Sequence, residues 1–121
     1  MATLTAILKL TSTDATTDSL SLSVSDSLSV EAPLSGPSRL SVGTSSAVNI
    51  LTSGGNTAKT YVYAKNLDAT NFVELKDDSG NTLIELGPGE ICFLPVQGGA
   101  GLEAQADTAA CEIEYGFWTA Q

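Results

Sequence analysis

The feature that most constrains this fold is a two-residue alternation of apolar and hydroxyl side chains near the N-terminus. Between residues 19 and 30, serine fills nearly every second position, and the positions between are mostly apolar: Leu20, Leu22, Val24, Leu28 and Val30. A strand points successive side chains to opposite faces, so this segment presents one apolar and one polar face. At helical period the same apolar residues would scatter around the axis. We predict a strand here, with Asp26 marking a bulge or a break in the apolar row.

The same alternation recurs in short segments along the chain, separated by turns. Residues 3–10 repeat the alternation, residues 60–66 are rich in the aromatic and β-branched residues that favour strands, and residues 82–86 follow a hairpin loop, whereas the proline-containing run 32–37 predicts an irregular connection. About nine short strands at roughly ten-residue spacing, with no substantial helix, indicate an all-β chain, an antiparallel β-sandwich or jelly roll. We expect residues 1–121 to form a single β-sandwich domain, with the N-terminal strands of residues 1–31 as a candidate assembly arm.

The charge balance argues against several partners. Fourteen acidic residues oppose five basic ones, with no histidine, for a net charge of −9 at pH 7. Such a chain repels phosphate, so we expect no nucleic-acid partner and no binding to an anionic membrane. No apolar stretch approaches the ~18 residues that span a bilayer. The N-terminal residues lack the basic start of a secretory signal, which predicts a protein made and kept in a cytoplasm or released within a particle.

No residue pattern suggests catalysis. Histidine, the commonest general base and a common metal ligand, does not occur in the sequence. We therefore expect no enzyme activity and no cofactor. Cys92 and Cys111 fall in predicted strands and are interpreted as two buried thiols, with a bridge between neighbouring strands as the alternative.

One loop contains several oxygen ligands. Asp77, Asp78 and Asn81 lie between two predicted strands and form a weak candidate for calcium. The loop lacks the alternating acids and the distal glutamate of a dedicated calcium loop. A hairpin turn is therefore the preferred interpretation.

The last predicted strand, residues 111–118, places Cys111, Ile113, Tyr115 and Phe117 inside and Glu112, Glu114 and Trp118 outside. The two glutamates form either a solvated face or a contact with a basic partner. Aromatic residues near this strand suggest either a sugar-binding platform or core and interface packing: Tyr61, Tyr63, Tyr115, Phe117 and Trp118. The residues chosen as interface candidates are Leu20, Leu22, Val24, Leu28, Tyr61, Tyr63, Phe117 and Trp118.

Two stretches carry a resemblance to a known class of proteins. They are the opening MATLTAILKLTSTDATTDSLSLSVSDSLSVEAP and residues 60–118, which contain NFVEL, LGPGE before an apolar strand, and LEAQADTAACEIEYG. Together they resemble small virion structural proteins of tailed bacteriophages, particularly marine cyanophages. The resemblance implies a component of the phage particle, on the head or the tail, and it assigns no functional site.

These observations lead to a functional prediction. We expect a capsid decoration (cement) protein that stabilises the outside of a phage head and is assembled in the host cytoplasm. The expected partners are the major capsid protein or another virion protein, and further copies of the chain, with a trimer favoured. The alternative is an adhesive module of the tail or fibre that binds a host-surface glycan.

Overall fold

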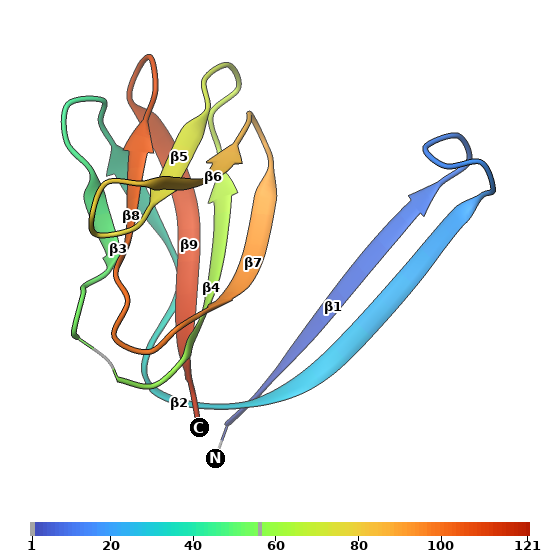
Figure 1. Cartoon of the computed structure of the whole chain (residues 1–121), viewed down its shortest axis with the longest axis horizontal. Helices are drawn as coiled ribbons and strands as arrows, with labels where there is room; N and C mark the ends of the chain where they lie inside the picture. Colours follow the sequence, from blue (N-terminus) through green and yellow to red (C-terminus); the bar gives the residue numbers. More distant parts are fainter. Residues whose placement is uncertain (1, 56) are drawn as a thin grey trace.

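The computed structural model describes residues 2–55 and 57–121, and this part of the chain is all-β. The predicted fold class is confirmed: the strands form two antiparallel sheets in a sandwich-like arrangement (Figure 1). No helix in the described residues is long and apolar enough to cross a membrane. The strands of the described residues are β1 (Ala2–Ser12), β2 (Leu20–Val42), β3 (Val48–Leu51), β4 (Thr60–Asn66), β5 (Val73–Lys76), β6 (Thr82–Leu86), β7 (Ile91–Val96), β8 (Leu102–Ala106) and β9 (Cys111–Ala120).

The larger sheet has the order β1-β2-β9-β4-β7, and the smaller has the order β3-β8-β5-β6. The hydrophobic core lies between β9, β4 and β7 of the first sheet and the second sheet. Leu75, Ile113 and Val62 are fully buried there. Buried positions alternate with half-buried ones along β8, and at the start of β9 Cys111 and Ile113 are buried while Glu112 is exposed and Glu114 half-buried, as a pleated strand with one covered face requires. These two layers form the body of the molecule.

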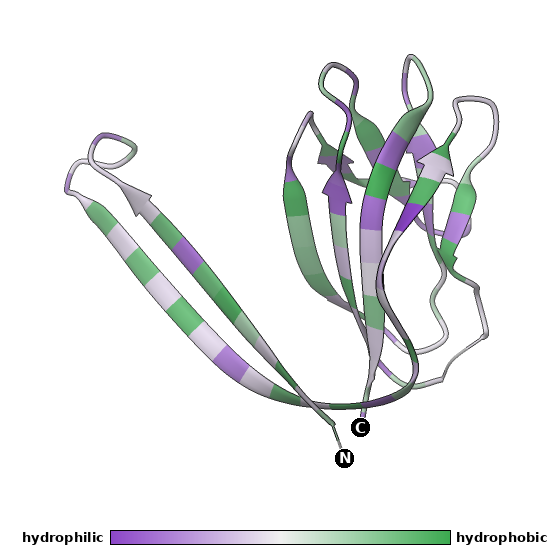
Figure 2. Cartoon of the chain, turned by 180° about the vertical axis from the view of Figure 1, so that it is seen from behind, coloured by the Kyte–Doolittle hydropathy of each residue, from purple (hydrophilic) through white to green (hydrophobic). Residues whose placement is uncertain are grey.

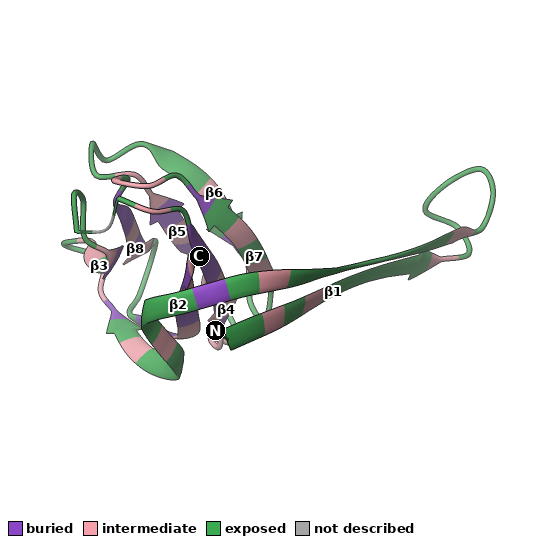
Figure 3. Ribbon diagram, turned by 90° about the horizontal axis from the view of Figure 1, so that it is seen from below, coloured by how far each residue is buried: buried purple, intermediate pink, exposed green. Residues whose placement is uncertain are grey.

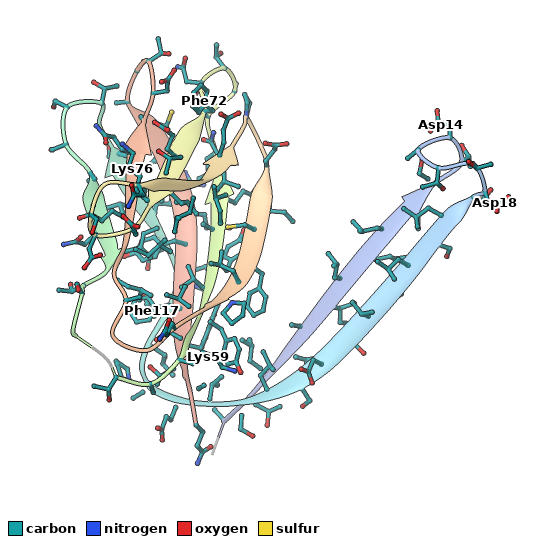
Figure 4. All side chains as sticks on the ribbon, in the orientation of Figure 1. Asp14, Asp18, Lys59, Phe72, Lys76 and Phe117 are labelled. Carbon is teal, nitrogen blue, oxygen red and sulfur yellow. The ribbon has the colours of Figure 1, made fainter. Side chains whose placement is uncertain are left out.

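The N-terminal strands project from this body. β1 pairs with residues 20–30 of β2 without a register shift, from Ala2 opposite Val30 to Ser12 opposite Leu20. We call this hairpin the arm; it leaves the body as one limb of a V (Figure 1). Asp14 and Asp18 lie at its tip, far from the body (Figure 4). Asp26 pairs regularly with Ala6, so the bulge predicted at Asp26 is wrong.

The irregularity occurs further along β2, at the prolines. The irregularity predicted for residues 32–37 is present, but β2 runs through it as one strand, so the separation into two strands expected there is wrong. Instead, the pairing with β9 shifts between Glu31 and Leu34 and again between Ser35 and Ser38. Beyond Glu31, β2 pairs on one side only, and proline is tolerated on such an edge and at bulges because it has no amide hydrogen to donate.

The shifts also change which face the apolar residues occupy. From Glu31 to Ser38 β2 advances seven residues, while β9 advances four, from Thr119 to Tyr115. The difference, three, is odd, so the alternation reverses between the two parts of β2. Leu40 and Val42 pair with Ile113 and Cys111 and face the core, whereas Val30 pairs with Ala120 and faces away from it. The apolar row of the arm therefore belongs to the outer face of the larger sheet.

Candidate functional site

A cleft of about 690 Å³ lies between the arm and the body. Its arm wall is formed by Leu4–Leu8 and Val24–Asp26, and its body wall by Tyr63, Ile91–Phe93 and Trp118. Because the apolar row of the arm and Trp118 lie on the same face of one sheet, the bend in β2 turns two parts of that face toward each other (Figure 1). Both walls of the cleft are mainly apolar.

The arm wall is a ribbon with one mainly apolar side, interrupted by the carboxylate of Asp26 opposite Ala6. Its cross-strand pairs include Leu4 with Leu28, Leu8 with Val24 and Leu10 with Leu22, and the alternation is visible along the ribbon in Figure 2. Near the tip this side is uncovered (Figure 3): Leu8 is 52% exposed and Val24 51%. An isolated two-stranded hairpin is at best marginally stable in water, and uncovered apolar rows mark binding surfaces.

The opposite side of the arm is polar. Thr3, Thr5 and Thr11 alternate there with Ile7 and Lys9, and serines stand opposite each of them on β2. Ile7 is 70% exposed and is the one large apolar residue among these positions. The arm is thus amphipathic across its thickness.

The body wall is an aromatic cluster on the outer face of β4, β7 and β9. The rings of Tyr61 and Phe93 are stacked, with centroids 6.1 Å apart and planes 10° apart, and Tyr61 pairs with Trp118 across the sheet. The ammonium of Lys59 lies 5.1 Å from the centre of the Tyr61 ring. At Gly116, a Cβ atom would lie 3.0 Å from the Trp118 ring, so glycine gives this ring room to lie along β9.

The phenol of Tyr63, on the body wall, is paired with a carboxylate of the same chain. The hydroxyl of Tyr63 donates a hydrogen bond of 2.7 Å to Oε1 of Glu114. Burial and this carboxylate together raise the pKa of Tyr63 to about 12, because both favour the protonated phenol. The other outward glutamate, Glu112, lies 3.9 Å from Arg39 in an exposed ion pair.

The structure divides the predicted interface candidates between two places. Leu20, Leu22, Val24 and Leu28 lie on the apolar side of the arm, and Tyr63 and Trp118 lie on the body wall. Tyr61 is on the same outer face of the sheet but is buried, stacked with Phe93, and does not line the cleft. Phe117 is not part of either wall: it packs against the core with Tyr115 (Figure 4). The five aromatic residues considered as one sugar platform therefore lie on opposite faces of the sheet.

Sequence reasoning missed Phe93 and Ile91 of the body wall. Both alternate with Cys92 and Leu94 in a segment that is apolar on both faces, so the pattern gave no sign that one face is open. In the structure that face is open, because Ile91 is 67% exposed and Phe93 is 43% exposed.

In the acidic loop of residues 77–81, the carboxylate of Asp77 is already hydrogen-bonded to groups of the same turn. The carboxylate of Asp77 accepts hydrogen bonds from the amides of Ser79 and Asn81, both 2.9 Å, and from Nδ2 of Asn81 at 3.0 Å. These bonds, those from Asn81 above all, lower the pKa of Asp77. Asp78 is exposed beside it. In the described part of the chain, no group of three or more Asp, Glu or Cys side chains is placed to hold a metal ion.

The two cysteines are free. Cys111 is buried and Cys92 half-buried, and burial raises the pKa of both thiols. The alternative of a bridge between neighbouring strands does not apply, because β4 lies between β7 and β9.

No protein-family model matches the chain, and no curated protein and no solved structure matches it significantly.

Proposed function

We propose that this chain is a structural subunit that binds other protein surfaces through its arm and cleft, and that it decorates the outside of a tailed-phage head. The single observation that carries the binding role is the arm, whose apolar side is exposed to water over its outer half. The assignment to a phage particle is supported by the sequence resemblance, and the external position by the charge of the chain.

The energy available on the arm is substantial. Leu8, Leu10, Leu22 and Val24 are between 39% and 52% exposed. Full burial of such a side chain contributes about 1.5–3 kcal/mol, so covering their remaining surface contributes roughly 1 kcal/mol each. A partner that covers this row gains about 4 kcal/mol before the cost of association.

The charge of the chain favours an external position. At a net charge of −9, the subunit is repelled by packaged DNA and keeps its solubility until it meets a surface. The major capsid protein or another virion protein is the partner this role requires.

A copy-number measurement tests the proposal. Purified particles would be analysed by quantitative mass spectrometry with a labelled standard of this chain. Hundreds of copies per particle support head decoration, whereas about six or twelve, as in the rings of a tail, refute it.

A second experiment tests which surface makes the contact. The purified chain is added to heads that lack it. Saturable binding that is lost in Leu22→Asp but kept in Leu83→Asp assigns the contact to the arm. Leu83 is a matched control because it is 60% exposed on β6, in the other sheet.

One observation favours the alternative, an adhesive module that binds glycans. Tyr63 and Trp118 lie on the body wall, beside the carboxylate of Glu114 and next to the buried Tyr61. Aromatic faces with a nearby acceptor suit a sugar ring. Saturable binding on a glycan array that is lost in Trp118→Ala would support this function, and an array without binding would refute it.

A further inference from the structure

We propose that the cleft is filled by the arm of a second copy of this chain, so that copies clasp one another by exchanging arms. This deepens the proposed function by naming the partner of the same surface, and it does not depend on the assignment to a phage head.

The exposed area is the first argument. A compact monomer of 12.4 kDa exposes about 6,100 Å² by the scaling of surface with mass. The chain exposes 7008 Å², about 900 Å² more. A stable protein interface of standard size removes about 800 Å² from each partner. The excess therefore equals one interface per chain, and it arises where the arm stands away from the body.

The reach of the arm argues against closure onto its own body. β1 has eleven residues and extends about 37 Å at 3.4 Å per residue. The cleft, however, is lined on the arm only as far as Leu8 and Val24. The next pair outward, Leu10 and Leu22, is 45% and 39% exposed. This pair lies outside the cleft that the body of the same chain forms, so it is left open to a second molecule.

A second copy supplies both surfaces that the cleft requires. Two arms packed apolar side to apolar side form the two-layer contact of a β-sandwich, with sheets about 10 Å apart. The polar side of the entering arm then faces the aromatic body wall of its partner. Lys9, the basic residue on the polar side of the entering arm, then lies close to the carboxylate of Glu114 in the receiving copy. The exposed Ile7 of the entering arm packs against the aromatic rings of the same wall. Since each copy has an arm and a cleft, the exchange closes on itself.

The mass of the full-length chain in solution tests this arrangement. Multi-angle light scattering after size-exclusion chromatography is expected to give two or three times 12.4 kDa for the unchanged chain. Leu22→Asp places a charge in the apolar row and is expected to shift the mass to one chain. Leu83→Asp, with the same change at an exposed position outside the cleft, is expected to leave the mass unchanged. Circular dichroism and the melting temperature confirm that each variant is folded.

Three results overturn the proposal: a monomeric unchanged chain over the micromolar range, an oligomer that Leu22→Asp leaves intact, or an oligomer that Leu83→Asp also dissociates. The head-binding experiment separates this failure from that of the proposed function. A monomer that saturates heads through Leu22 refutes arm exchange and keeps decoration. An oligomer that needs Leu22 but ignores heads keeps arm exchange and refutes decoration.

Discussion

Replacing Asn66 by alanine is expected to destabilise the body strongly. Asn66 is fully buried at the end of β4. Its Nδ2 donates to the carbonyls of Asn71 at 2.9 Å, Leu86 at 3.0 Å and Gly87 at 3.2 Å, and its Oδ1 accepts from the amide of Asp68 at 2.9 Å. One side chain thus joins β4 to the following loop and to the turn between β6 and β7.

The size of the effect follows from these contacts, in which the two hydrogens of Nδ2 are shared among three carbonyls and Oδ1 accepts one bond, for about three hydrogen bonds in all. Each contributes about 1 kcal/mol net, and a buried group left without its partner costs more. Only the bond to Leu86 is wholly buried, so water replaces part of the rest, and we expect a loss of about 3 kcal/mol. At about 4 °C per kcal/mol for a chain of this size, the melting temperature falls by roughly 12 °C.

Urea unfolding followed by tryptophan fluorescence measures the loss directly. The matched control is Asn49→Ala, because Asn49 is exposed on β3. Its expected change is within about 0.5 kcal/mol. If Asn66→Ala loses no more than this control, the side chain does not hold these segments together and the reasoning fails.

Three further predictions concern the body. Leu75→Ala removes a fully buried side chain between the sheets and is expected to cost about 3 kcal/mol in the same urea assay; a loss below 1 kcal/mol would contradict the packing. Tyr63, whose pKa is raised to about 12, is expected to ionise late in an absorbance titration, and Glu114→Gln is expected to lower its pKa. Because the folded state favours the protonated phenol, its contribution to stability is present below pH ~10 and is lost as the pH rises through about 12; an unchanged titration in the variant would exclude the hydrogen bond. Asn81→Ala is expected to raise the lowered pKa of Asp77 toward its ordinary value in an NMR titration, and no change would show that the turn is not held as described.

Much of the fold follows from local strand signals, which are period-two alternation, aromatic and β-branched content, and turn residues between the segments. The expected segments 60–66 and 82–86 coincide with β4 and β6, and the inward side of β9 is as predicted, with Ile113 buried and Phe117 against the core. These agree because local alternation fixes which residues share a face. The continuity of β2 through Pro33 and Pro37 could not be predicted in this way, because it depends on pairing with β9, more than 70 residues later.

The candidate site was predicted only in part, for a related physical reason. Alternation identifies the apolar row of Leu22 and Val24, but it does not tell whether that row is covered by the core or left open. The answer depends on the reversal of faces within β2 and on the bend that separates arm from body. Both are properties of the pairing between strands, and neither has a local sequence signal.

The reversal within β2 makes the segment between Glu31 and Ser38 sensitive to length more than to composition. In this segment β2 has three residues more than the part of β9 it pairs with, and this odd number decides which face each half of β2 presents. Removing a single residue would restore an unbroken alternation and turn the leucines of the arm to the reverse of the sheet, with every side chain otherwise unchanged. A natural or designed variant of this chain therefore has to gain or lose residues in this segment in twos to keep the leucines of the arm on the same face.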